Sequence, residues 1–415
     1  MSICTLLLIF IFSTSSCTAK SINKQGQIKS SLCAGCHGKN GIGVANEFPN
    51  LAGQKSAYLQ KQLLDFKTGK RNNATMNAMT QTLTPTDIKN LAVYFSTLPR
   101  HSSAMSANSI NNHPPKKNKV SIIEFPEIVF SSMKGSGSIE SFPSEIVATG
   151  GENMLYTALT PDATMLLSTS PSTDTVYIFN AKILQRLAII NVGKAPKGVK
   201  VMPNGKFAYV SNQGSNNISI IDLNTLKNIG AIKTASGPHN VRFTKNSKLA
   251  YVTLQGGAGI GVIDTIKAKM IHIIPVTGIT GAHNLDLSGD EKIAYVRDFV
   301  HHVAVVDLTS EKVLKMLTVG NGHGGIDVFP NGKFVATAAI GDNFISVINT
   351  KTLTINNIQL GTASHGIRVS KDNQWLYITL PKENTIAVIN TNNWQVEKRI
   401  AVGKFPFWLA VQGNP

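Results

Sequence analysis

The segments 207–212 (FAYVSN) and 218–222 (ISIID) decide the fold of most of this 415-residue chain. Both are short, β-branched or alternating runs, and the turn signal PNG at 203–205 precedes them, so they predict strands joined by tight turns. The same pattern recurs downstream, at 250–253 with 261–264, 294–297 with 305–307, 344–348, and 376–379 with 386–389. A repeat of four short strands predicts the blade of an all-β propeller.

Aligning the first strand of every repeat gives equivalent positions spaced by 42, 42, 44, 41, 41 and 42 residues: Leu155, Lys197, His239, His283, Gly324, His365 and Phe407. Six complete blades span about 151–403, and 406–412 is a seventh first strand with nothing after it. Residues 127–150 can supply the outer strands of that last blade. We therefore expect a seven-bladed propeller over 120–415, closed by its N- and C-terminal strands so that no sheet edge is left open.

The sharpest motif lies near the other end of the chain, where Cys33-Ala34-Gly35-Cys36-His37 forms a C-x-x-C-H run. Two thiols at this spacing can add to both vinyl groups of one haem, and the following imidazole then lies over the iron as axial ligand. The other interpretation is a redox dithiol or half of a zinc site. The chain has no second Cys pair, and no thioredoxin-like pattern surrounds this one. We expect one covalent haem c.

In these motifs, the repeat resembles the YVTN family of seven-bladed propellers. Residues 24–100 resemble a class I cytochrome c of the c4-like kind, a small all-α fold, so the cytochrome domain is placed at 20–100. An amphipathic helix is expected over 58–69, with Tyr58, Leu59, Leu63 and Phe66 on one face, and another helix is expected after Thr84. The resemblance implies a methionine as sixth iron ligand: Met76 stands seven residues before Leu83, the family's spacing, whereas Met79 falls at a packing position.

Residues 1–19 and 101–119 are not expected to belong to either domain. Residues 5–12 form an apolar run of signal-peptide length, so 1–19 are interpreted as a signal peptide and the protein as exported to the periplasm. Cys17 is either removed with that peptide or carries a lipid anchor. Attachment to a membrane is expected only through this anchor. Residues 101–119 lack hydrophobic periodicity and are rich in Ser, Asn, Pro and Lys, which predicts a linker.

The positive charge is concentrated in the first part of the chain. Lys and Arg number 40 and Asp and Glu 23, a formal charge of +17, and residues 20–119 carry +11 of it. The motifs there are those of electron transfer and not of nucleic-acid recognition, so nucleic acid is excluded as a partner. We expect an acidic redox partner protein or a small anionic substrate, with a simple solvated lysine face as the alternative.

Histidines recur at the equivalent first-strand positions of the propeller. His239, His283 and His365 occupy three of them, His323 is one residue out of register in the intervening blade, and Lys197 stands beside them. First strands begin at the mouth of a propeller, and neutral imidazoles that converge there suit copper, iron or a second haem. These five residues are the candidate catalytic set, and the four histidines are candidate ligands of a second metal centre. The alternative is a structural Gly-His element inherited by duplicated blades.

A c-type cytochrome ahead of such a propeller resembles the cytochrome cd1 nitrite reductases and related haem d1 propeller proteins. That resemblance implies a haem d1 iron ligand and proton donors among His239, His283 and His365, although the propeller of that family has eight blades. The sequence therefore favours a periplasmic oxidoreductase in which haem c exchanges electrons with a centre at the propeller mouth that acts on a small inorganic anion. The alternative is a non-enzymatic cytochrome whose propeller carries a cofactor or docks a partner.

Overall fold

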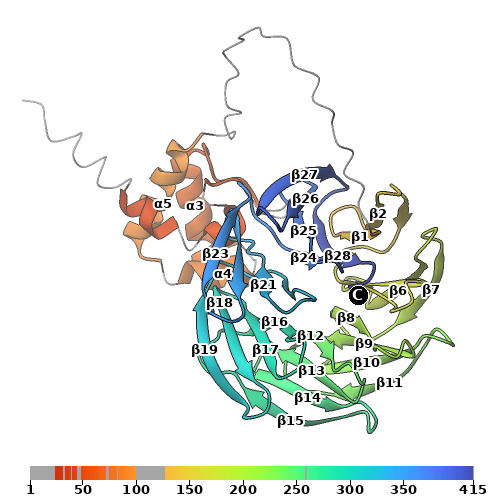
Figure 1. Ribbon diagram of the computed structural model, residues 1–415. Coiled ribbons are helices and arrows are strands. Elements are labelled where there is room, and N and C mark those ends of the chain that lie inside the picture. Colours follow the sequence, from red (N-terminus) through yellow and green to blue (C-terminus); the bar gives the residue numbers. More distant parts are fainter. Residues whose placement is uncertain are drawn as a thin grey trace, which may run out of the picture. The chain divides into compact units, whose positions relative to one another are not determined.

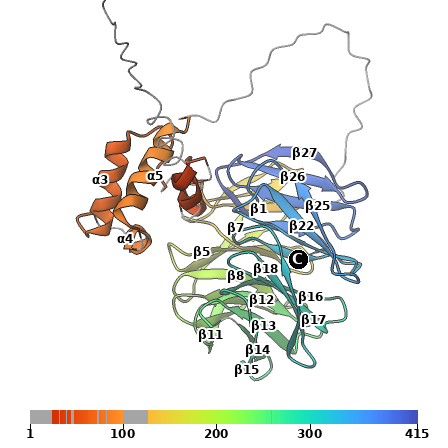
Figure 2. The same ribbon diagram turned by 90° about the vertical axis from the view of Figure 1, so that its left-hand side faces the viewer.

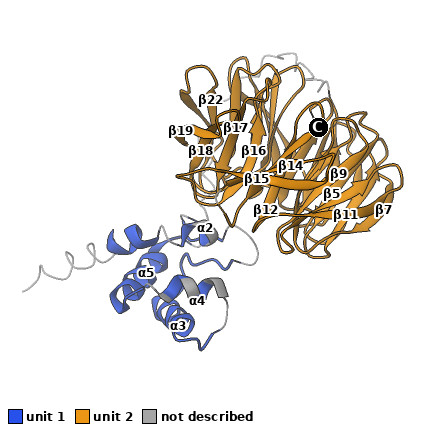
Figure 3. Cartoon of the chain, turned by 90° about the horizontal axis from the view of Figure 1, so that it is seen from below, with its two compact units in different colours: residues 1–120 blue, residues 121–415 orange. Residues whose placement is uncertain are grey.

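The structure, a computed structural model, describes residues 24–30, 33–38, 40–43, 48–71, 74–81, 83–99, 127–257 and 259–414. The chain divides into two compact units, Met1–Val120 and Ser121–Pro415 (Figure 3). The expected signal peptide and linker, with Cys17, fall outside the described residues. The expected division into a small all-α unit followed by a seven-bladed all-β propeller is confirmed.

The first unit consists of short helices (Figure 1). Residues 24–29 are helical, and the helices that follow are α2 (Ala34–His37), α3 (Ser56–Lys67), α4 (Ala74–Gln81) and α5 (Pro85–Thr97). The start of α5 is fixed by a reciprocal cap, in which the Thr84 side chain accepts from the Asp87 backbone N–H while the Asp87 carboxylate accepts from the Thr84 backbone N–H. Pro85 occupies the first turn, where its missing N–H costs nothing.

The core of the first unit lies between α3 and α5. It is built from Leu59, Leu83, Ile88, Leu91, Ala92 and Phe95, with Cys33 packed against it. Within α3, Leu59 and Phe66 are buried as the periodicity predicts, whereas Tyr58, expected on the same face, is 49 % exposed. Gly26 lets the first helical segment cross α5 closely, because a Cβ there would clash with the Asn90 carbonyl oxygen.

The second unit is built from seven four-stranded antiparallel sheets. From the innermost strand outward, the first four sheets are β4–β7 (Thr157–Leu159, Met165–Ser170, Thr175–Asn180, Arg186–Asn191), β8–β11 (Pro196–Val201, Phe207–Asn212, Asn217–Asp222, Lys227–Lys233), β12–β15 (Pro238–Phe243, Leu249–Leu254, Gly259–Asp264, Lys269–Pro275) and β16–β19 (Ala282–Leu287, Ile293–Asp298, His302–Asp307, Lys312–Thr318). The next two sheets are β20–β23 (Ile326–Val328, Phe334–Thr337, Phe344–Asn349, Ile355–Gln359) and β24–β27 (Ile367–Val369, Trp375–Leu380, Thr385–Asn390, Gln395–Ala401).

The seventh sheet joins the two ends of the propeller. Its innermost strand is β28 (Pro406–Val411), which pairs with β1 (Val129–Met133), and β2 (Ser138–Phe142) and β3 (Val147–Thr149) complete it. In the register of β1 and β28, Val129 lies opposite Val411. The expected closure by the N- and C-terminal strands is therefore confirmed. It leaves no blade with a missing neighbour.

The blades surround a central axis, with innermost strands such as β8, β12 and β16 beside it (Figures 1 and 2). The second and third strands of each blade are mostly buried against neighbouring blades, whereas outermost strands such as β11 and β27 expose most of their residues. Three innermost strands carry a bulge next to their first residues, in β8, β12 and β16. Bulges redirect side chains, and here they lie at the aligned positions Lys197, His239 and His283. No helix in the described part of the chain has the length and apolar character to cross a membrane.

Candidate haem site and the aromatic ring at the propeller axis

His37 closes α2 and is buried, with 5 % of its surface exposed. Its Nδ1 atom lies 2.8 Å from the carbonyl oxygen of Pro49. A carbonyl only accepts, so Nδ1 carries the proton and donates it, and the lone pair resides on Nε2. This is the arrangement that prepares an imidazole to bind a metal through Nε2 and fixes the orientation of the ring.

The other predicted haem residues are consistent with that assignment. Cys33 is half-buried next to the apolar core, and the backbone of Cys36 lies in α2, one turn from it, while the Cys36 side chain lies outside the described part. Met76 and Met79 both lie on α4; Met76 is half-buried and Met79 is 42 % exposed. These residues fit a covalent haem c, and the choice of Met76 as sixth ligand stays a prediction.

The predicted propeller histidines meet in a closed ring of six side chains, which we call the aromatic ring. Neighbouring ring centroids lie 4.1, 4.8, 5.2, 3.9, 5.5 and 5.5 Å apart in the order His239, His283, His323, His365, Phe407, Tyr156 and back to His239. Each member comes from a different blade, at or just before its innermost strand. The remaining blade, β8–β11, contributes Lys197, which follows the first residue of β8.

Two of these imidazoles donate to the backbone of the next blade. Nδ1 of His239 lies 2.9 Å from the carbonyl oxygen of His283, and Nδ1 of His365 lies 2.9 Å from that of Phe407. Both histidines therefore carry the proton on Nδ1 and keep the lone pair on Nε2. The Nε2 atom of His365 is buried and has no hydrogen-bond partner among the described residues. The bonds to backbone carbonyls are the structural role considered as the alternative, yet they also leave Nε2 available to a ligand.

All four imidazoles of the aromatic ring are held neutral. Burial lowers the pKa of His239 to about 3, with a further contribution from Lys197, and burial lowers that of His365 to about 4. Burial and the neighbouring histidines hold the pKa values of His283 and His323 well below their usual range. His283 also accepts a hydrogen bond at Nδ1 from the Asn284 amide, 2.8 Å away. Neutral imidazoles are the form that binds metal ions.

Two lysines flank the aromatic ring. Lys197 lowers the pKa of His239, and Lys134, which follows β1, lowers those of His365 and His323. Burial and the charge of Lys134 lower the pKa of Lys197 itself. The environment of the ring is therefore electropositive, which attracts anions.

Two adjacent residues at the end of β17 order the loops over the aromatic ring. Arg297, fully buried, donates to the carbonyl oxygens of Gly320, Gly322 and His302. Asp298 accepts from the backbone N–H groups of Thr280, Val300 and His302 and from the His302 ring. Between these anchors, Phe299 stacks on His323 with centroids 4.6 Å apart and stays 44 % exposed. Phe299 thus covers one side of the ring.

The structure brings His239, His283, His323, His365 and Lys197 together, as the period of the repeat predicts. It does not show the second metal centre: within the described residues, no three His, Cys, Asp or Glu side chains form a group that could hold a metal ion. Sequence reasoning missed Tyr156 and Lys134. Tyr156 is one residue beyond the aligned Leu155, and Lys134 follows β1, the second strand of the closing blade, where the period of the first strands gives no signal.

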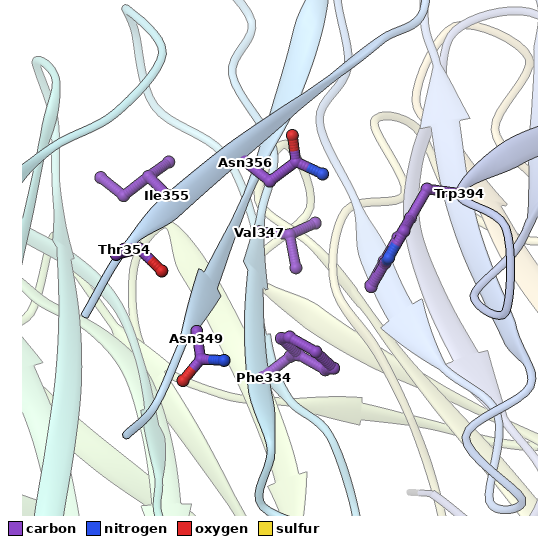
Figure 4. Close-up of a pocket in the computed structure, with 7 residues that line it drawn as sticks. All are labelled: Phe334, Val347, Asn349, Thr354, Ile355, Asn356 and Trp394. Atoms are coloured by element: carbon purple, nitrogen blue, oxygen red, sulfur yellow. The ribbon is translucent and has the colours of Figure 1, made fainter. Parts of the chain in front are cut away.

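A shallow hollow of about 160 Å³ lies elsewhere on the propeller, at the outer strands of two adjacent blades (Figure 4). Phe334, Val347 and Ile355 of one blade line it together with Trp394 from the turn between β26 and β27. The Trp394 ring also packs edge-on against Phe334, with centroids 5.5 Å apart. The hollow shares no residue with the aromatic ring, and Trp394 there serves to pack neighbouring blades.

Comparison with known proteins identifies the first unit. Residues 27–99 match the family model described as "Cytochrome c". Over 74 residues the chain is 39 % identical to cytochrome c-554(548) of Halomonas halodenitrificans, covering 89 % of that protein and 17 % of this chain. The chain belongs to the cytochrome c family. It is also 43 % identical over 70 residues to cytochrome c4 of Pseudomonas aeruginosa, covering 17 % of this chain but only 35 % of that protein.

The propeller of this cytochrome c matches other proteins more distantly. Residues 148–281 match the family model described as "YNCE-like beta-propeller". Among solved structures, Kuenenia stuttgartiensis hydrazine synthase aligns with a TM-score of 0.58 at 18 % identity, over 63 % of this chain and 90 % of that one. A likeness at this level of identity concerns the fold alone. The cytochrome c family implies a covalent haem c, and the described haem residues fit it.

Proposed function

We propose that this cytochrome c is a periplasmic electron-transfer protein in which haem c exchanges electrons with a second redox group bound at the aromatic ring, where a small inorganic anion reacts. Cys33 and Cys36 would hold the haem covalently, and His37 and Met76 would bind its iron. The haem supplies one-electron transfer. The observation that carries the proposal is the aromatic ring itself, with neutral histidines whose Nε2 lone pairs are set by bonds at Nδ1.

The described donors limit what such a second group can be. No three of them form a metal site. The metal of a group bound there would therefore have one or two imidazole ligands from the protein, and its other ligands would come from elsewhere. A porphyrin iron has this requirement, since the macrocycle supplies four nitrogens, and copper with solvent ligands is the other candidate. His239 and His365 are the candidate ligands because, in their tautomers, Nε2 carries a lone pair and no proton. Lys197 and Lys134 would attract the anion.

The basic first unit supports an acidic redox partner. Lys24, Lys55 and Lys89 are exposed on it, and Asp65 and Asp87 are paired with Lys61 and Lys29, at 2.5 and 3.5 Å. The unpaired excess of positive charge favours a negatively charged protein surface, which would steer association at low salt.

The experiment is rapid mixing of the full-length haem-loaded protein with two oxyanion probes. The reduced protein is mixed with nitrite and the oxidised protein with thiosulfate, and the haem spectrum is followed. We expect one probe to change the redox state of the haem, and His239→Ala with His365→Ala to abolish that reaction while the haem spectrum stays unchanged. The same substitution at His272, which is exposed on β15, is the control. An unchanged rate in the double variant would refute the proposal.

A second candidate function is supported by a specific observation. The His239 and His365 bonds to backbone carbonyls tie neighbouring blades, and no three-ligand metal site is described. Both are compatible with a non-enzymatic cytochrome whose propeller docks a partner. In that case neither probe reacts with the haem, and the histidine substitutions change only stability.

A further inference from the structure

The charge of the propeller is distributed unevenly among its blades. Residues 157–275, which form the three successive blades β4–β7, β8–β11 and β12–β15, contain 13 Lys and Arg and 4 Asp and Glu, a net charge of +9. The rest of the propeller, 121–156 and 276–415, contains 13 and 16, a net charge of −3. We call the three positive blades the basic sector. Their outermost strands β7, β11 and β15 follow one another along the rim (Figure 1), so the positive charge is concentrated on one side of the propeller.

Most of this charge is exposed at the end of the blades opposite the aromatic ring. The first strands begin at the ring, so in an antiparallel blade the turns after the first and third strands lie at the other end. The exposed cations in or next to these turns of the basic sector are Lys182, Arg186, Lys206, Lys227, Lys245, Lys248, Lys267 and Lys269. We call the surface that carries them the basic face. The carboxylates of the same turns, Asp162, Asp222 and Asp264, each accept hydrogen bonds from backbone N–H groups of their own turn.

At two turns of the basic face, an exposed isoleucine stands next to a lysine. Ile183 follows Lys182 between β6 and β7, and Ile266, which is 78 % exposed, precedes Lys267 between β14 and β15. The second turn is held in place by Asp264, whose carboxylate accepts from the backbone N–H groups of Ile266 and Lys267 at 3.0 and 2.9 Å. Each turn therefore presents an apolar group and a cation together.

The outermost strands of the basic sector add a second row of exposed aliphatic side chains. Leu187, Ile229 and Ile271 are each the extra residue of a β-bulge in β7, β11 and β15, one or two residues after the first residue of the strand. All three are exposed. The extra residue of a bulge is unpaired and the strand bends there. In β27, outside the basic sector, the bulge residue at the equivalent position is Glu397, so the aliphatic row is not required by the bulge itself.

The mixture of aliphatic side chains and lysines indicates which kind of partner fits the basic face. The cores of protein–protein interfaces are enriched in aromatic residues and depleted in lysine, whereas the aromatic side chains of the basic sector are buried or half-buried. A second copy of the chain would bring two positive surfaces together, which is unfavourable. Proteins that bind to membrane surfaces combine apolar side chains, which enter the boundary of head groups and acyl chains, with cations that contact anionic head groups.

We propose that the basic face binds the surface of a membrane rich in anionic phospholipid. Ile183, Ile266 and the bulge residues enter the boundary between head groups and acyl chains, and the neighbouring lysines contact the phosphates. This attachment needs no covalent lipid and is therefore distinct from the anchor considered for Cys17. The aromatic ring lies at the opposite end of the blades, so a propeller bound in this way keeps the ring directed away from the lipid.

The test is co-sedimentation of the full-length haem-loaded protein with vesicles of phosphatidylcholine and phosphatidylglycerol in equal parts, and with vesicles of phosphatidylcholine alone. We expect binding to the anionic vesicles that weakens as salt is raised. Lys182→Glu with Lys206→Glu should weaken it at least about tenfold, because each cation near an anionic surface contributes to binding. Lys351→Glu with Lys333→Glu is the matched control and should leave the affinity nearly unchanged. These two lysines are exposed at the equivalent turns of the blade β20–β23, outside the basic sector.

A second pair of substitutions tests the apolar contact without changing the charge. Ile183→Ser with Ile266→Ser should weaken binding to the anionic vesicles roughly tenfold, because two aliphatic side chains no longer leave water. Val300→Ser, an exposed position at the aromatic-ring end of the blades, should have no effect. The first unit and Cys17 are the same in all variants, so any difference arises from the propeller. Equal losses in the two lysine pairs would overturn the proposal. An isoleucine variant that binds as the wild type does would also overturn it and would leave an acidic protein as the occupant of the basic face.

Discussion

The Nδ1 atom of His239 donates to the carbonyl oxygen of His283 across 2.9 Å, and the centroids of the two imidazoles are 4.1 Å apart. One hydrogen bond thereby joins β12 to β16 of the next blade and fixes which nitrogen of His239 keeps the lone pair. The structural and the functional interpretation of this histidine are compatible, because they use different nitrogen atoms of the same ring. The same holds for His365 and the carbonyl of Phe407.

The neutral histidines make the stability of the propeller depend on pH. His239 and His365 have folded pKa values of about 3 and 4, below the ordinary value near 6.5 in the unfolded chain. As pH falls from 7 to 5, His239 and His365 take up protons in the unfolded chain but stay neutral in the folded protein. Stability is complete above about pH 6.5 and is lost toward pH 4, by roughly 2 kcal/mol per histidine between pH 7 and 5.

Denaturant unfolding of single variants at both pH values measures this effect. His239→Gln should reduce the loss of unfolding free energy between pH 7 and 5, because a group that titrates only in the unfolded chain has been removed. His272→Gln, at an exposed position, is the control and should reduce the loss less than His239→Gln does. Equal pH dependence in both variants would show that His239 is not held neutral.

The sixth haem ligand can be assigned by a pair of substitutions on α4. Met76→His should lower the reduction potential of the haem, because a thioether favours the ferrous state more than an imidazole does. We expect a change above about 0.1 V, part of the roughly 0.8 V that axial ligands span. Met79→His should leave the potential unchanged. A change in the Met79 variant alone, measured by potentiometric titration, would transfer the ligand assignment to Met79.

The closing blade should make a large contribution to the stability of the propeller. Leu409 on β28 is fully buried against Tyr377, Ile386 and Val388 of the neighbouring blade. Leu409→Ala should cost about 2–5 kcal/mol of unfolding free energy through lost burial and a cavity. Leu314→Ala is the matched control, since Leu314 on β19 is 56 % exposed and should cost less than about 0.5 kcal/mol. Similar losses in both variants would contradict closure by the terminal strands.

The lysines of the first unit should govern association with an acidic redox partner. Lys55→Glu with Lys89→Glu should slow reduction or oxidation by an acidic partner protein and weaken the dependence of its rate on ionic strength, because electrostatic steering is lost. Lys227→Glu with Lys312→Glu makes the same change of charge at exposed positions of the propeller. If the propeller variant slowed the reaction more, docking on the first unit would be wrong.

The period of the repeat was sufficient to predict the seven blades, their closure and the meeting of four histidines, because these depend on strand order and length. The directions of individual side chains could not be predicted from the period. The innermost strands β8, β12 and β16 begin with a register shift, whereas the pairing of β4 with β5 has none. The residue before β4 that joins the aromatic ring is Tyr156 and not its aligned neighbour Leu155. Tyr58 shows the same limit in the first unit, where helical periodicity places it on the buried face although it is exposed.

A layer of charged side chains on the innermost strands could have been found from the sequence. Advancing the same alignment by three residues gives Lys200, Arg242, Asp286, Asp327 and Arg368 in succession. Charged residues at a period-defined position inside predicted strands are unusual enough to indicate a buried polar network. Lys134 and Phe299, by contrast, follow the second strands of their blades, β1 and β17, where only the three-dimensional structure brings them to the aromatic ring.

The most direct measurement for the central claim is the metal content of the purified full-length haem protein, determined together with its optical spectrum. The proposal predicts one haem c iron and, in addition, a second metal or porphyrin that is lost when His239 and His365 are both replaced by alanine. One haem c iron per chain and no other redox group, with the two histidines intact, would contradict it.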